Sequence, residues 1–105
     1  MKSLKDYCRE CHETAVEKGF YDPYSAPQME CPRPTPELLM LVVSELGEAC
    51  EADRHGDKEH FNEEMADVFI RLFDMCEYLG IDIEKEINSK MIINKGRPRL
   101  HGKKY

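Results

Sequence analysis

The chain of 105 residues has the length of a single domain with a modest core, which gains stability when it also buries surface against another copy. Its 21 acidic and 15 basic side chains give a net charge of −6, which argues against nucleic acids and acidic membranes as partners. No stretch approaches the roughly 18 uninterrupted apolar residues of a membrane span, and the first residues lack the apolar segment of a signal peptide. We therefore expect one cytoplasmic domain over residues 1–105, with small or proteinaceous partners.

The first predicted element is a helix that starts after Ser3, whose hydroxyl can cap it, and ends at Gly19. Its apolar or small residues recur at helical spacing at Leu4, Cys8, Cys11 and Ala15. Residues 20–36 hold five of the six prolines and show no period, so we expect a connecting loop there.

Two cysteines of the first helix belong to the sequence "CRECH", Cys8 to His12, which has the spacing of a covalent haem attachment site. Haem attachment of this type belongs to exported proteins, and a zinc site that recruits Cys31 would still lack a fourth ligand. The five cysteines are an odd number in a chain without an export signal, which indicates reduced thiols. We interpret Cys8 and Cys11 as small hydrophobic residues of the helix.

Three further helices are predicted after the loop. Thr35 as cap and Pro36 in the first turn begin a helix that runs to about Arg54. The next helix spans roughly residues 58–79 and stops at Gly80, and the last opens at Asp82 and ends near Gly96. No segment shows the alternation of a strand, so the sequence predicts an all-α fold.

Acidic residues interrupt the apolar stripes of the second and third predicted helices. The second helix has its stripe at Leu38, Leu41, Val42, Glu45, Glu48, Ala49 and Ala52. The third has its stripe at Phe61, Glu64, Asp67, Val68, Leu72, Met75 and Leu79. Burying four carboxylates together is untenable without cations, and a site made only of oxygen ligands suits Mg²⁺ or Mn²⁺.

Two other interpretations of these acids compete with a magnesium site. Pairs of acids three residues apart are common on exposed helix faces, and 34% of this chain is charged. A di-iron bundle also draws on helix carboxylates, but it needs the spacing Glu-x-x-His, which does not occur here. We interpret His55 and His60 as surface residues of the turn between the two helices.

The fourth helix carries cations where its inward stripe should continue. Ile83 and Ile87 begin the stripe, and Lys90, Asn94 and Arg97 follow at helical steps. Such a strip of donors without a matching acid suits phosphate oxygens, although cations near a helix C-terminus also favour the helix dipole.

The segments "SELGEACEADR", "EEMADV" and "KMIINKGRPRLHGKK" resemble the MazG-type branch of the all-α nucleoside triphosphate pyrophosphohydrolases, and the likeness covers nearly the whole chain. That family has a Glu-x-x-Glu helix followed by a Glu-x-x-Asp helix, although Ser44 stands where its motif usually has one more glutamate. The resemblance implies that Mg²⁺ binds at Glu45, Glu48, Glu64 and Asp67. It also implies that phosphates bind at Lys90, Asn94 and Arg97.

The segment "HETAVEKGFYD" is similar to the part of the family that lines the base pocket, which implies that His12, Phe20 and Tyr21 surround the nucleobase. A hydrophobic plug under the proline-rich loop is an equal interpretation of Phe20 and Tyr21.

The activity that the resemblance implies is hydrolysis of ribo- or deoxyribonucleoside triphosphates to the monophosphate and pyrophosphate. Glu48 is our candidate for the base that takes a proton from water, and Lys90 and Arg97 would steady the departing pyrophosphate.

The third predicted helix is apolar nearly all round, because Phe69, Ile70 and Phe73 lie opposite its acids. A second copy is needed to cover that face, so we expect a four-helix MazG-like bundle that assembles as a homodimer or a dimer of dimers. Two other hypotheses are a non-catalytic helical module that binds proteins and a metal-storage or redox bundle.

Overall fold

The computed structural model describes residues 1–22 and 33–104. Within these residues there are four α-helices: α1 (Leu4–Glu17), α3 (Thr35–Arg54), α4 (Lys58–Tyr78) and α5 (Ile83–Lys95). A short 3-10 helix, η1 (Arg99–Gly102), follows them, and the described residues contain no strand. The predicted all-α fold is confirmed, and Cys31 lies outside the described residues.

Local capping explains where the helices begin. The Ser3 hydroxyl accepts a hydrogen bond from the Asp6 backbone N–H at 3.2 Å, and the Asp6 carboxylate accepts one from the Ser3 N–H at 2.9 Å. The side chain of Asp57 caps α4, and that of Asp82 caps α5. The prediction that Thr35 is a cap was wrong, because Thr35 is already helical and the extended Pro34 precedes it without a side-chain cap.

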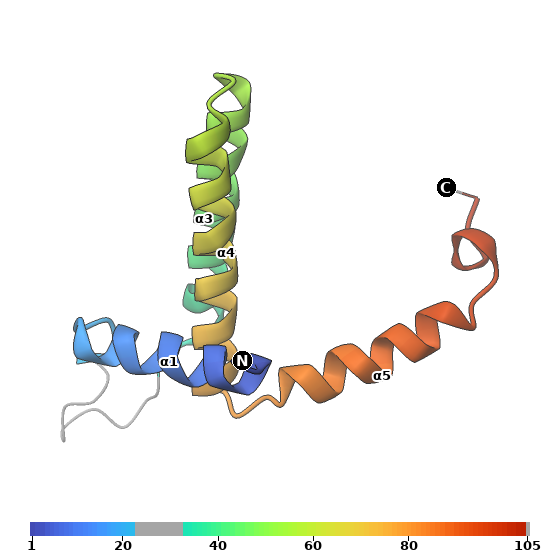
Figure 1. The fold of residues 1–105 in the computed structure, drawn as a ribbon, viewed down its shortest axis with the longest axis horizontal. Coiled ribbons are helices and arrows are strands. Elements are labelled where there is room, and N and C mark those ends of the chain that lie inside the picture. Colours follow the sequence, from blue (N-terminus) through green and yellow to red (C-terminus); the bar gives the residue numbers. More distant parts are fainter. Residues whose placement is uncertain (23–32, 105) are drawn as a thin grey trace.

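The long helices α3 and α4 form an antiparallel pair that turns at Gly56, where φ is +68°. Helix α1 lies across the end of this pair where α3 begins and α4 ends (Figure 1). The core there contains Tyr21, Leu38 and Met75, with Leu72 and Tyr78 packed against them. Among the described helices, none is both long and apolar enough to cross a membrane.

Helix α5 differs from the prediction. It has no buried residue, and it leads away from α3 and α4 beyond the start of α1 (Figure 1). The stripe through Ile83, Ile87, Lys90 and Asn94 was predicted to face a core, and this was wrong for the single chain. The reason is the sharp connection after α4, which sends α5 away from the helix pair, so one chain does not complete a four-helix bundle by itself.

Candidate functional site

Three carboxylates converge between α3 and α4. Oxygens of Glu45 and Glu48 on α3 and of Glu64 on α4 lie within 4.8 Å of one another. Glu64 is buried, with 7% of its surface exposed, whereas Glu48 is exposed although the sequence predicted it to be inward. Successive residues of an α-helix are rotated by about 100° around its axis. Glu48 therefore lies at the edge of the α3–α4 interface, whereas the adjacent Ala49 is buried in it. We call Glu45, Glu48 and Glu64 the acid trio.

Glu64 is the member of the acid trio that has a buried oxygen without a hydrogen-bond partner among the described residues. Its Oε1 lies 2.8 Å from the Nε2 atom of His60, and its buried Oε2 has no hydrogen-bond partner among the described residues. Burial raises the pKa of the Glu64 carboxyl, and His60 opposes that rise. The carboxylates of Glu48 and Glu45 raise the same pKa further. A buried anionic oxygen without a donor, aimed at two other carboxylates, fits the oxygen ligands of a hard dication.

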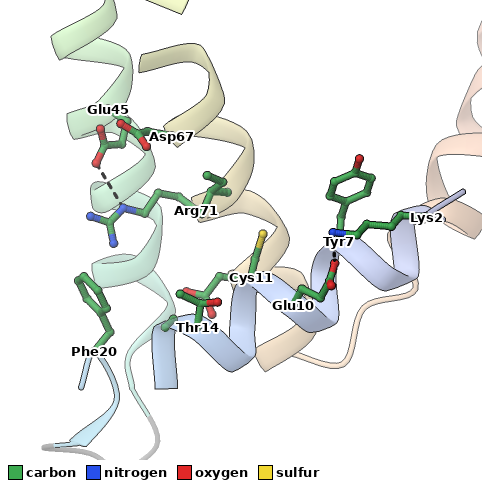
Figure 2. Close-up of a pocket in the computed structure, with 12 residues that line it drawn as sticks. Lys2, Tyr7, Glu10, Cys11, Thr14, Phe20, Glu45, Asp67 and Arg71 are labelled. Carbon is green, nitrogen blue, oxygen red and sulfur yellow. Dashed lines mark hydrogen bonds and ion pairs between the residues drawn. The ribbon is translucent and has the colours of Figure 1, made fainter. Parts of the chain in front are cut away.

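Asp67, the fourth predicted acid, does not belong to the acid trio. It lies one turn after Glu64 on α4, is exposed, and lines the same neighbouring cavity as Glu45 (Figure 2). The structure therefore brings three of the four predicted acids together and places Asp67 at their border.

His60 was interpreted as a surface residue of a turn, and this was incomplete. About half of its side chain is exposed, but its ring bonds to the buried acid of the trio. The spacing of four residues between His60 and Glu64 on a helix was the available signal. His55 is confirmed as a surface residue, since it pairs only with the exposed Glu51 among the described residues.

A cavity of about 620 Å³ adjoins the acids, which is within the range of small-molecule sites. We call it the α1–α4 cleft (Figure 2). Its lining residues are Lys2, Tyr7, Glu10, Cys11, Thr14, Ala15, Phe20, Glu45, Asp67, Ile70, Arg71 and Asp74. The cleft therefore combines carboxylates from α1, α3 and α4 with aromatic and aliphatic side chains such as Tyr7, Phe20 and Ile70.

Arg71 connects the acid trio to the cleft. Its Nε donates a hydrogen bond to Glu45 Oε1 at 3.3 Å, and its guanidinium carbon lies 5.1 Å from the centre of the Phe20 ring. Figure 2 shows the guanidinium between these two side chains. No periodicity marked Arg71, because an arginine four residues after Asp67 is an ordinary feature of a polar helix face.

Two of the three residues predicted near a nucleobase are held by Asp74. His12 Nδ1 lies 2.8 Å from Asp74 Oδ1, and the Tyr21 hydroxyl donates to the same oxygen at 3.0 Å. Burial raises the pKa of Tyr21, and the Asp74 charge raises it further. Asp74 and Phe20 line the cleft, whereas His12 and Tyr21 do not. The pattern around "HETAVEKGFYD" thus contains one cleft residue and two residues that fix Asp74.

The predicted phosphate-binding residues are not brought to the acid trio within one chain. Lys90, Asn94 and Arg97 are exposed on α5 and just after it, and α5 leads away from α3 and α4 (Figure 1). Arg97 is within 3.3 Å of the His101 ring nitrogen.

Comparison with known families agrees with this geometry. Residues 34–99 match the MazG nucleotide pyrophosphohydrolase domain. The match covers more than half of the chain, so the chain belongs to this family, and the resemblance is confirmed. The matched segment contains the acid trio, Asp67 and Arg71, and it begins after α1. No curated protein and no solved structure matches the chain.

Proposed function

We propose that this protein is a Mg²⁺-dependent pyrophosphohydrolase that cleaves ribo- or deoxyribonucleoside triphosphates to the monophosphate and pyrophosphate. The family supports nucleotide pyrophosphohydrolysis in general. The observation that carries the more specific proposal is the buried Glu64 oxygen without a donor, which converges with Glu45 and Glu48 beside a cleft of about 620 Å³.

The acid trio would hold the metal, with Asp67 as a further oxygen ligand from the border of the cleft. Mg²⁺ fits these residues because they offer only hard oxygen atoms, and Mn²⁺ shares that preference. When bound, the dication neutralises phosphate charge and makes a bound water more acidic. His60 would orient the Glu64 carboxylate from its outer side.

The α1–α4 cleft would receive the nucleoside. Phe20 offers an aromatic face for a base, and Asp74 offers a carboxylate oxygen that His12 and Tyr21 hold in one orientation. Arg71 lies between Phe20 and Glu45, so it is placed to bind a phosphate oxygen where the base side and the metal side meet.

The reaction would be the attack of water on phosphorus, which breaks the bond between the α-phosphate and the oxygen that bridges it to the β-phosphate. The electron pair of that bond leaves with pyrophosphate. Glu48, the exposed member of the acid trio, is accessible to take the proton from water, since Ser44 supplies no carboxylate. Lys90 and Arg97 would bind the pyrophosphate, with Asn94 as a further donor.

We further propose that the protein works as a homodimer or a dimer of dimers. Large apolar residues remain exposed on the helix pair, among them Leu39, Val43, Leu46, Phe69 and Ile70. A second copy would cover them and complete a bundle of four long helices.

The test is release of pyrophosphate from a panel of ribo- and deoxyribonucleoside triphosphates, with and without Mg²⁺. We expect Mg²⁺-dependent release from the wild-type protein and a loss of at least about a hundredfold in Glu64→Gln, because the buried ligand is lost. Glu63→Gln, an exposed neighbour on the same helix, is the matched control and should keep full activity. Full activity of Glu64→Gln would reject the assignment, and the absence of hydrolysis from the whole panel would favour a helical protein-interaction module.

A further inference from the structure

The α1–α4 cleft contains a carboxylate that the acid trio does not use. Asp74 on α4 is buried, with 7% of its surface exposed, and it lines the cleft. A buried carboxylate is costly unless hydrogen bonds compensate it, and two bonds reach Asp74, from His12 and from Tyr21. These two bonds satisfy only part of the carboxylate, which leaves the other part to a ligand.

The two oxygens of Asp74 have different surroundings. His12 Nδ1 lies 2.8 Å from Oδ1, and the Tyr21 hydroxyl donates to the same oxygen at 3.0 Å. An ionised carboxylate only accepts hydrogen bonds, so we assign the His12 proton to Nδ1. Oδ1 thus has two donors, whereas Oδ2 has no hydrogen-bond partner among the described residues. Because Asp74 lines the cleft, Oδ2 is the acceptor that it offers there.

Aromatic packing holds this carboxylate in one orientation. The ring of His12 meets that of Tyr21 edge to face at 5.0 Å, and Tyr21 packs against Tyr78 at 4.7 Å. The Tyr78 hydroxyl accepts a hydrogen bond from the Arg33 backbone N–H at 2.7 Å. The two donors to Oδ1 are therefore fixed themselves, and Oδ2 cannot rotate away without breaking their bonds. An acceptor that is held in place in this way is preorganised for a ligand.

Helix α4 places Asp74 away from the metal side of the cleft. Asp67, Arg71 and Asp74 follow one another at steps of four and three residues, so they lie along one face of the helix. The seven residues from Asp67 to Asp74 span about 10 Å at 1.5 Å per residue, which is comparable with the length of a nucleoside. Phe20 lines the cleft and directly precedes Tyr21, which bonds to Asp74. We therefore expect a base that packs on Phe20 to turn its edge toward Asp74.

The cations that line the cleft are engaged with other acids. Among the described residues, Lys2 and Arg71 are the lysines and arginines of its lining. Lys2 pairs with Glu10 at 3.0 Å, and Arg71 donates to Glu45 at 3.3 Å. Around Asp74 the cleft therefore offers an acceptor without a cation beside it, which fits a ligand that brings its own N–H group.

Nucleobases differ in the group that they would place against Oδ2. Cytosine has an exocyclic amino group at C4 and adenine has one at C6, and both groups donate N–H. Uracil and thymine have a carbonyl oxygen at C4, and hypoxanthine has one at C6. A carbonyl oxygen that faces a carboxylate oxygen is repelled, and it leaves the buried acceptor unpaired. One fixed acceptor oxygen therefore distinguishes amino bases from oxo bases.

We propose that Asp74 selects the base, and that the cleft takes nucleotides with an amino group at pyrimidine C4 or purine C6 in preference to their oxo counterparts. The amino group donates to Oδ2, while His12 and Tyr21 occupy Oδ1. The effect of this selection on hydrolysis rests on the proposed function, whereas the preference in binding needs no hydrolysis.

Matched nucleotide pairs test the selection in the wild-type protein. dCTP and dUTP differ only in the amino or oxo group at C4, and dATP and dITP differ only in the same way at C6. We expect kcat/KM with Mg²⁺ to be about ten- to a hundredfold higher for the amino member of each pair, because the oxo member loses a hydrogen bond to a charged group. Equal kcat/KM within a pair that is hydrolysed, or a higher value for its oxo member, would overturn the proposal.

Asp74→Asn separates selection of the base from stability. The amide oxygen of the variant can accept from His12 and Tyr21 as Oδ1 does, and the amide NH₂ group then takes the place of Oδ2. A donor at this place favours a carbonyl oxygen, so dUTP should become a better substrate than dCTP. A general loss of folded protein would lower both activities and keep their ratio. A variant that keeps the wild-type ratio would therefore overturn the proposal.

Glu77→Gln is the matched control for this variant. Glu77 is an exposed acid three residues after Asp74 on α4, and it does not line the cleft. The ratio of kcat/KM for dCTP and dUTP should stay at the wild-type value. A reversed ratio in this control would show that any change of charge on α4 alters the preference, and it would overturn the assignment to Asp74.

Binding of the monophosphates dCMP and dUMP, measured by titration calorimetry, separates the selection from the proposed function. If the wild-type protein hydrolyses no triphosphate but binds dCMP about tenfold more tightly than dUMP, and Asp74→Asn reverses that order, the proposed function fails and the selection stands. If triphosphates are hydrolysed with equal kcat/KM within each pair, the selection fails and the proposed function stands. A protein that hydrolyses no triphosphate and binds neither monophosphate would overturn both.

Discussion

Mg²⁺ should stabilise the folded protein through the acid trio, and the size of this effect follows from linkage. A ligand that binds only the folded state adds RT ln(1 + [L]/Kd) to the free energy of unfolding. For a dissociation constant of about 1 mM, Mg²⁺ at about 10 mM adds about 1.4 kcal/mol, which raises the Tm of a domain of this size by about 6–11 °C. The trio is already assembled within 4.8 Å, so little of this gain is lost to reorganisation.

Removing the buried ligand should reduce this stabilisation. A site that Glu64→Gln weakens tenfold retains about 0.4 kcal/mol at the same Mg²⁺ concentration, which is a shift of about 2–3 °C. The measurement is thermal unfolding by circular dichroism at one protein concentration, with NaCl matching the ionic strength so that general screening cancels. Glu59→Gln, an exposed acid at the start of α4, is the control and should keep the wild-type shift. Equal shifts in the wild type and Glu64→Gln would refute the assignment of the buried oxygen as a metal ligand.

Four further outcomes follow from the same contacts. Because the pKa of Glu64 is raised in the folded state, the metal-free protein should lose stability as the pH rises from the ordinary glutamate range through that raised pKa, and Glu64→Gln should flatten this part of a denaturant-unfolding profile. The same proton competes with Mg²⁺, so titration calorimetry should show affinity falling as the pH is lowered through that range. Phe20→Ala should raise KM more than it lowers kcat, since the ring lines the cleft but carries no group that can transfer a proton, and steady-state kinetics would show the opposite split if Phe20 acted in the chemical step. Asp74→Asn should lower the free energy of unfolding, measured in urea, by about 1–3 kcal/mol, because it replaces the carboxylate that bonds to His12 and Tyr21. An unchanged urea midpoint would show that this network contributes little to stability.

The helices of this protein were predictable because their ends are encoded locally. Ser3 caps α1 and Asp82 caps α5, and Gly80 ends α4 with a positive φ that other residues rarely adopt. Such signals depend on a few neighbouring residues and need no tertiary information. The errors were small, as at Thr35, where both candidate starts lay within one residue of each other.

The acid trio was predictable for a different reason. A carboxylate inside an apolar stripe conflicts with burial, so Glu45 and Glu64 stood out without any structure. The sequence could not show that Glu48 turns outward, because the edge of a helix interface depends on how α4 crosses α3. The hydrogen bond from Arg71 on α4 to Glu45 on α3 depends equally on that crossing.

The largest departure from the sequence prediction was α5, and its cause is physical. A stripe with helical period shows that a face is covered, but it does not show which chain covers it. Within the described part of one chain, the stripe of Ile87 and Lys90 has nothing to cover it. The helical period of this stripe and its exposure are consistent with each other if the covering surface belongs to a second copy, as in the proposed homodimer.

Arg71 gives the metal-free site a way to remain assembled. Without a dication, the acid trio concentrates negative charge around a buried oxygen, and like charges at such distances repel. The hydrogen bond from Arg71 to Glu45 offsets part of this repulsion, while Phe20 holds the guanidinium from the other side. A dication at the trio would take over that neutralisation and leave the Arg71 donors available to a phosphate in the cleft. On this reasoning Arg71→Ala should weaken the folded protein most when Mg²⁺ is absent, and a loss of stability that Mg²⁺ does not reduce would contradict it.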